Sequence, residues 1–232
     1  MNRQILCEAI GCISRKITEN KQYLIDLDAK FGDGDLGISM SNGFEAVHDF
    51  LQDTEETDMG TVLLKCATVF NKTSPSSLGT ILSFGFMGAA RHCKGKTELT
   101  LQDAAGAMDK ALEHMMNKAQ SQPGEKTILD AIAPAVEVLK LHAGNGEPAA
   151  TDMPDGERAE APPAVTPTAK KREALAYQAA YEAAEQGMLS TKDMLAVHGR
   201  AAYYGDKVIG HIDGGAVVGK LIFEGLRDYY AG

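Results

Sequence analysis

Apolar residues recur at three- and four-residue spacing along most of this chain, and this spacing limits its fold more than any other feature. In the first such stretch the residues are Ile5, Leu6, Ala9, Ile10, Ile13 and Ile17. This spacing puts apolar side chains on one face of an α-helix. It predicts about eight helices, near residues 5–17, 61–70, 77–92, 101–115, 126–142, 171–188, 190–200 and 214–230. Convincing two-residue alternation, the sign of a strand, is absent.

Helices with one apolar face, in a chain without strands, must bury those faces against one another. The predicted fold class is therefore all-α, as a helical bundle or a closed helical ring. Helix-start signals at Thr100 with Asp103, and at Ser190 with Asp193, support two of the predicted boundaries.

One segment departs from the helical pattern. Residues 143–171 hold five of the eight prolines and have no apolar period. The 232 residues, 44% of them hydrophobic, are enough for one core. We therefore expect a single domain over residues 1–232 with a flexible insertion at about 143–171.

Charge and cysteine usage exclude several classes of function. The net charge of −9 disfavours nucleic acid and anionic membranes as partners. No apolar run is long enough for a membrane span, so the expected location is cytoplasmic. The cysteines, at positions 7, 12, 66 and 93, lie in apolar periodic stretches and predict buried thiols rather than disulfides or zinc ligands.

The segment DAKFGDGDLG, residues 28–37, contains a literal G-x-G-x-x-G. A dinucleotide loop needs a preceding strand, whereas residues 21–28 look like the end of a helix. A calcium loop starting at Asp33 would put Phe44 where a bidentate Glu belongs. What remains is an array of three carboxylates, Asp28, Asp33 and Asp35, which the glycines allow to converge.

Converging carboxylates repel one another, whereas a divalent cation between them attracts each carboxylate and makes the arrangement favourable. Oxygen ligands without His or Cys suit Mg²⁺, which leaves coordination positions for water and phosphates. The alternative from local sequence is an Asp/Gly turn with solvated carboxylates.

A second polar segment, TSPSSLGT, precedes an apolar helix. Hydroxyls and free N–H groups at a helix N-terminus form an anion site, although such a cap is often structural. The candidate phosphate-binding residues are Thr73, Ser74, Ser76, Ser77, Gly79 and Thr80. Together with the carboxylates they favour nucleotide phosphates bridged by magnesium.

Three motifs in order carry a resemblance over nearly the whole chain outside the insertion. LDAKFGDGDLG, QPGEKTILDAIAPA and GMLSTKDMLAVHGRAAYYGDKVIGHIDGGA are similar to the nucleotide-binding L subunits of bacterial dihydroxyacetone kinases. The resemblance implies an antiparallel eight-helix barrel that binds ADP or ATP at one end. It also implies that Asp28, Asp33 and Asp35 hold the phosphates through two Mg²⁺ ions.

The same resemblance implies roles for other residues. The hydroxyls of residues 73–80 would hold phosphate, Arg200 and Asp213 would lie near the nucleotide, and Gly214 would let the last helix approach it. Lys126 and Thr127 follow Pro-Gly and have either a nucleotide-side role or the role of an ordinary helix start.

Three positions depart from the family pattern. Leu36 stands where a histidine is usual, and Asn42 where an arginine is usual. Residues 73–77, TSPSS, replace a Gly-Gly-x-Ser-Gly loop.

The implied activity is phosphoryl transfer to a small ketose such as dihydroxyacetone, held on a separate K-type subunit. No catalytic side chain is predicted in this chain. The implied partners are that subunit and, if ADP is resident, a phosphohistidine protein of the phosphotransferase system, in a homodimer or hetero-oligomer. Two alternatives are the nucleotide domain of another kinase, related to fatty acid kinases, and a non-enzymatic interaction protein with bound ADP.

Overall fold

The computed structural model describes residues 1–144 and 169–232, and these residues fold almost entirely into helices. The α-helices are α1 (Arg3–Glu19), α2 (Lys21–Asp28), α3 (Leu36–Asp53), α4 (Met59–Thr73), α5 (Ser77–Cys93), α6 (Leu101–Ala119), α7 (Leu129–Gly144), α8 (Ala169–Ser190) and α9 (Gly214–Ala231). Two 3₁₀ segments, η1 (Thr191–Asp193) and η2 (Arg200–Val208), lie between α8 and α9. The described residues contain no strand, so the predicted all-α class is confirmed.

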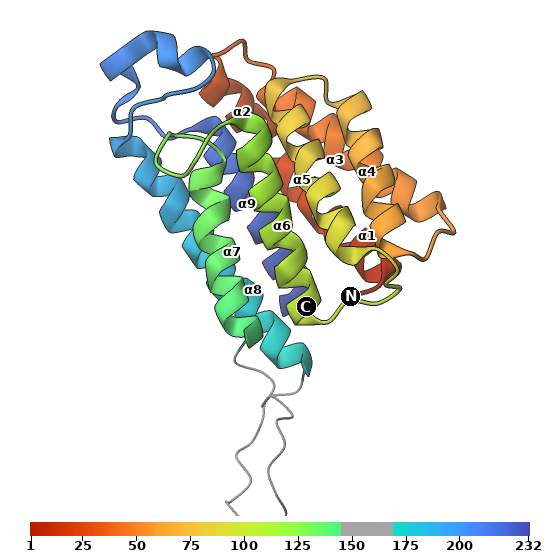
Figure 1. Ribbon diagram of the computed structural model, residues 1–232. Coiled ribbons are helices and arrows are strands. Elements are labelled where there is room, and N and C mark those ends of the chain that lie inside the picture. The colour runs from red at the N-terminus through yellow and green to blue at the C-terminus, as the bar shows by residue number, and fades with distance from the viewer. Residues whose placement is uncertain (145–168) are drawn as a thin grey trace, which may run out of the picture.

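The long helices form a closed antiparallel ring (Figure 1). From α3 to α9 each helix packs against the next in the chain, α9 packs against α1, and α1 packs against α3. The short α2 lies across one end, against α3 and α9. The predicted antiparallel eight-helix barrel is therefore confirmed for the described residues. Of the predicted insertion at 143–171, the first two and last three residues belong to α7 and α8, and the rest lies outside the described residues.

Helix α3 was not among the predicted helices. Its apolar stripe of Met40, Phe44, Val47 and Leu51 has helical spacing, but small residues such as Ser39, Ser41 and Gly43 are buried beside it. A Cβ at Gly43 would lie 2.7 Å from the Phe70 ring, so the close packing of α3 on α4 requires small residues. Serine and glycine contribute no apolar signal, and the stripe is hard to recognise for this reason.

The predicted helix at 190–200 is wrong. The chain makes one 3₁₀ turn at Thr191–Asp193, continues as a loop, and turns again in η2. The cause is tertiary, because the Val197 N–H donates to the carbonyl of Glu125 rather than within a helix. The predicted helix at 126–142 also begins later, at Leu129, since Lys126 has a positive φ of 59°.

The interior of the ring is apolar and incompletely filled. A cavity of about 180 Å³ lies among α1, α3 to α7 and α9, with Phe44, Phe86, Met115 and Phe223 in its wall. Phe44 also meets Phe70 edge-on, with ring centroids 5.0 Å apart. Aromatic side chains of this kind join neighbouring helices of the ring.

The antiparallel arrangement sorts the connections between helices into two ends. Both termini and the loops after α3 and α5 lie at one end (Figure 1). The loops after α2, α4, α6 and α8 lie at the other end, and the predicted site residues lie in these loops or in the helix turns that adjoin them. In the described part of the chain, no helix combines the length and the hydropathy that a membrane span requires.

We expect Phe44→Ala to lower the free energy of unfolding by about 3–5 kcal/mol, because it enlarges the interior cavity and removes the contact with Phe70. Urea denaturation followed by circular dichroism measures this change. Glu45→Ala, at the exposed next position of the same helix, is the matched control and should change stability by less than about 0.5 kcal/mol. Equal effects of the two substitutions would contradict the assignment of Phe44 to the core.

Candidate functional site

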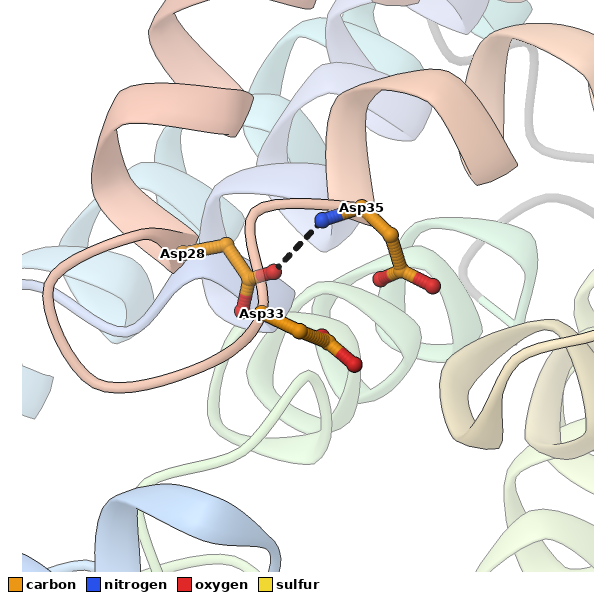
Figure 2. Close-up of side chains that lie close together, drawn as sticks. All are labelled: Asp28, Asp33 and Asp35. Atoms are coloured by element: carbon orange, nitrogen blue, oxygen red, sulfur yellow. Dashed lines mark hydrogen bonds between the residues drawn. The ribbon is translucent and has the colours of Figure 1, made fainter.

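Three aspartates meet in the turn between α2 and α3 (Figure 2). Asp28 is the last residue of α2, Asp35 directly precedes α3, and Asp33 lies in the loop between them. One carboxylate oxygen from each residue lies within 4.8 Å of the others. The sequence prediction that these side chains converge is therefore confirmed as geometry.

The turn is held by backbone donors. Asp28 Oδ2 accepts hydrogen bonds from the N–H groups of Asp35 at 3.0 Å and Leu36 at 3.4 Å. Gly34 has a φ of +74°, a region that glycine adopts without strain. A Cβ at Gly32 would overlap Asp28 Oδ1, so this position also requires glycine. The chain thus folds around the Asp28 carboxylate and leaves Asp33 and Asp35 exposed.

The cluster carries excess negative charge. Burial and the neighbouring Asp33 and Asp28 carboxylates raise the pKa of Asp35, and Arg200 acts in the opposite direction. The Arg200 guanidinium lies 2.6 Å from Asp33 Oδ2 and is the one cation paired with the cluster in the described residues. The cluster thus has three carboxylates and one positive charge. Its possible ligand atoms are all oxygens, and such a group can hold a hard divalent cation.

The hydroxyl-rich segment after α4 is joined to this turn by Ser39, a residue that the sequence analysis missed. Ser39 Oγ lies 2.6 Å from Ser74 Oγ and 2.7 Å from Ser76 Oγ. Its N–H donates to the carbonyl of Asp35, the residue that caps the start of α3. The spacing of four residues from Asp35 places Ser39 on the same helix face, and that signal could have identified it.

The predicted hydroxyls have different roles in the structure. The hydroxyls of Thr73 and Thr80 donate to the carbonyls of Val69 and Ser76, and Ser74 is fully buried. Ser76 caps α5 by accepting from the N–H of Gly79 at 3.1 Å.

Ser77, the first residue of α5, is exposed. Within the described residues no acceptor pairs with the N–H groups of Ser77 or Leu78. Such free donors at a helix start favour an anion.

Lys126 is buried and ties three loops together. Its ammonium donates to the carbonyls of Thr191 and His211, the latter at 2.6 Å. Burial lowers the pKa of Lys126, and the nearby Asp213 and Asp130 carboxylates oppose that shift.

Thr127 has a role in the same turn. Its N–H donates to Asp130 Oδ2 at 2.6 Å, and its hydroxyl accepts from the Leu129 N–H at 3.2 Å. Both predicted residues thus order the loop before α7 in this structure.

Asp213 and Gly214 begin α9. The Asp213 carboxylate accepts from the Ala216 N–H at 2.7 Å, and burial raises its pKa to about 6. The Asp213 N–H donates to the Thr191 hydroxyl at 3.1 Å. A Cβ at Gly214 would lie 2.7 Å from Leu36 Cδ2, so the start of α9 packs closely on the start of α3.

Aromatic contacts complete the connection between the loops. Phe31, in the acidic turn, lies edge-on to both Tyr204 and His211, with ring centroids 5.2 Å apart in each pair. One group of contacts joins the acidic turn, Ser39 and the start of α5. A second group joins the Lys126 loop and the start of α9, and Phe31 connects the two groups through His211. No local pattern indicates the role of Phe31, because its partner Tyr204 lies 173 positions away in the chain.

The sequence profile of the DAK2 domain family matches residues 30–174 and 160–228. A PEP-dependent dihydroxyacetone kinase 2, ADP-binding subunit DhaL, from Listeria innocua is 28% identical over 217 residues, which is 91% of this chain and 89% of that protein. The corresponding ADP-binding subunit from Escherichia coli is 28% identical over 195 residues, 84% of this chain and 81% of that protein.

Similarity also extends to a solved structure. The dihydroxyacetone kinase of C. freundii, in complex with AMP-PNP and Mg²⁺, matches 98% of this chain with a TM-score of 0.68 and 19% identity. This chain covers 34% of that longer protein. At this identity the match establishes the shared fold.

We expect the Asp213 carboxylate to make stability depend on pH. Its pKa is raised from 3.8 to about 6 in the folded chain, so the folded state binds this proton more tightly than the unfolded state. Between about pH 4 and pH 6, ionisation of the folded carboxyl therefore costs about 1–3 kcal/mol of stability. Asp213→Asn keeps a helix cap, so its unfolding free energy relative to wild type should rise over this interval.

Urea denaturation at several pH values measures this difference. Asp58→Asn, at the cap of α4, is the matched control, because hydrogen bonds from Thr61 lower the pKa of Asp58. The pH dependence should have the opposite sign for this control. Wild type should be more stable than Asp58→Asn at neutral pH, and this difference in unfolding free energy should disappear only as the pH falls below about 4. A flat difference for Asp213→Asn from pH 4 to 7 would contradict the raised pKa.

Proposed function

This chain belongs to the DAK2 domain family, and from that premise we propose that it is the ADP- or ATP-binding subunit of a dihydroxyacetone kinase. In this proposal it transfers a phosphoryl group to a ketose held by a separate subunit. The observation that carries the proposal is the convergence of Asp28, Asp33 and Asp35 beside the start of α5. The ADP-binding subunits from Listeria innocua and Escherichia coli support it, because each aligns with most of this chain.

The three carboxylates fit a magnesium site. Their donor atoms are all oxygens and lie within 4.8 Å of one another. Burial and then the neighbouring carboxylates raise the pKa of Asp35, and a bound cation would offset that excess negative charge. Asp28 would be the fixed ligand, since two backbone N–H groups already orient it. Bound Mg²⁺ would supply charge neutralisation between the phosphate oxygens of a nucleotide.

The start of α5 would receive the phosphates. Free N–H groups of Ser77 and Leu78, with the helix dipole behind them, are suited to anionic oxygens. Ser39, Ser74 and Ser76 would keep this helix start fixed against the acidic turn.

We assign the other predicted residues to the rim of the nucleotide site. Arg200, paired with Asp33 and otherwise exposed, is free to turn toward phosphate. Lys126, Thr127, Asp213 and Gly214 would shape the loops around it, and Thr73, Gly79 and Thr80 would maintain the ends of α4 and α5.

The acceptor would come from another protein. Beside the acidic turn, residues 194–209 expose Leu195, Val197, Tyr203, Tyr204 and Ile209, with Tyr203 90% exposed. Exposed apolar side chains on an anchored segment suit a protein partner. We therefore propose that a K-type, dihydroxyacetone-binding subunit docks here, in a hetero-oligomer of cytoplasmic, single-domain chains. The names of the relatives, PEP-dependent and PTS-dependent, favour a phosphohistidine protein as the source of the phosphoryl group.

The nucleotide proposal is tested with Asp35→Asn. Wild-type protein should gain thermal stability with ADP and Mg²⁺, by about 2.7 kcal/mol at a hundredfold excess over Kd, and EDTA should remove the gain. Asp35→Asn should lose this gain but be at least as stable as wild type without ligand, because the raised pKa shows that ionised Asp35 is unfavourable in the folded chain. Differential scanning fluorimetry measures both effects.

Asp49→Asn, at an exposed position of α3, is the matched control and should behave as wild type. A nucleotide-induced shift that survives EDTA and Asp35→Asn alike would refute the magnesium site.

The partner proposal is tested by a coupled assay of dihydroxyacetone phosphate. The chain alone with ATP, Mg²⁺ and dihydroxyacetone should form little product, and adding a K-type subunit with its phosphoryl donor should restore turnover. Leu195→Ser should raise the partner concentration needed for half-maximal rate severalfold while leaving Mg-ADP binding unchanged. Leu64→Ser on α4 is the control, since both leucines are 49% exposed. Robust turnover by the isolated chain would contradict a split kinase.

A further inference from the structure

A polar groove lies between α5 and α6 on the side of the ring. It has a volume of about 410 Å³ and is separate from the acidic turn, which contributes no residue to it. Its lining residues are Gly88, Arg91 and His92 from α5, and Lys110, Glu113, His114 and Asn117 from α6. We call this cavity the α5–α6 groove.

Gly88 lines the groove at a point where α5 and α6 pack closely. A Cβ at this position would overlap the carbonyl oxygen of Lys110 and lie 2.8 Å from the Cβ of His114. The two helix backbones therefore touch here without a side chain between them. The longer side chains on either side of this contact form the walls.

The groove is cationic although the whole chain has a net charge of −9. Arg91 is exposed and has no acidic partner among the described residues. Glu113, the one acid in the lining, is paired with Lys110, whose ammonium lies 2.7 and 2.8 Å from its two oxygens. One further cation, Lys118, lies over the Phe84 ring at 5.8 Å, and that ring meets His114 edge-on.

His114 supplies an unmet hydrogen bond. Its Nε2 atom is buried and has no partner among the described residues. Buried polar atoms in folded proteins are nearly always paired, so an atom of this kind beside a groove indicates a missing partner. The pKa of His114 is lowered by burial and then by the Arg91 and Lys118 charges, which shows that the positive potential reaches the ring.

We propose that the α5–α6 groove is a second binding site, for a small anion that carries a phosphate group. Its oxygens would accept hydrogen bonds from the Arg91 guanidinium and, after a side-chain rotation that opens the solvent-inaccessible Nε2 atom to the groove, from the protonated His114 ring, with Lys110 at the edge. A phosphate suits this set because a guanidinium and an imidazolium can each donate to a different oxygen. The proposal does not depend on the nucleotide site.

Binding of this kind takes up a proton at His114, and NMR can follow that proton. The groups that face the ring are Arg91 and Lys118, which lower its pKa, and Phe84, which is neutral. In the full chain without nucleotide, inorganic phosphate should raise the pKa of His114 by about half a unit or more over sodium chloride of equal ionic strength. The NMR signals of His142, exposed on α7, should not respond to phosphate and serve as the internal control.

Two variants distinguish a site from general screening. Arg91→Gln should abolish the phosphate-induced shift of His114, whereas Arg15→Gln, which removes the same charge from exposed α1, should leave it intact. Glycerol 3-phosphate serves as a second probe. Tighter binding than inorganic phosphate would support an organic phosphate as ligand, and equal binding would support the free ion. An unchanged His114 pKa with both probes, or a shift that persists in Arg91→Gln, would overturn the proposal.

Discussion

The closure of the helical ring is the constraint on which the rest of this structure depends. Each long helix has one apolar face, and without a sheet those faces can be buried only against other helices. In residues 1–144 and 169–232, the closed antiparallel ring buries these faces and leaves none of its eight long helices at an edge. Because neighbouring helices alternate in direction, every second connection lies at the same end, and loops distant in sequence become neighbours there (Figure 1). The position of the candidate site is thus a consequence of core packing.

At that end the fold holds together charges that repel one another. Asp35 has a raised pKa beside Asp28 and Asp33, while the backbone N–H groups of residues 35 and 36 keep Asp28 in place. Stability contributed elsewhere by the apolar stripes offsets the repulsion, and the glycines allow the backbone of the turn to adopt its conformation without strain. In the proposed function, this arrangement would be preorganised for a cation, because the backbone already fixes carboxylates that repel one another. The ammonium of Lys126 is also buried, but two backbone carbonyls, of Thr191 and His211, accept hydrogen bonds from it.

Sequence patterns predicted the parts of this molecule that depend on local periodicity. The apolar spacing identified most helices, and the spacing of three aspartates around glycines identified the acidic turn. What was not predicted depends on contacts between distant residues. Residues 194–199 form a loop instead of the predicted helix, because the Val197 N–H donates to the carbonyl of Glu125. Helix α3 packs on its neighbours through buried serines and glycines, which do not contribute to an apolar pattern. The role of Ser39 depends on the packing of α3 against the start of α5, which brings its hydroxyl to those of Ser74 and Ser76.

Leu36 shows how packing and chemistry meet at the site. The resemblance leads to an expectation of histidine at this position, but here the side chain is buried against the start of α9 at Gly214. Its N–H still donates to Asp28, so the backbone geometry of the acidic turn does not require a particular side chain. Compared with a histidine, Leu36 lacks a polar group and instead makes an apolar contact between α3 and α9. The start of α9 therefore packs directly on the residue next to Asp35, so the position of the acidic turn depends on the packing of the last helix as well as on the backbone of the turn.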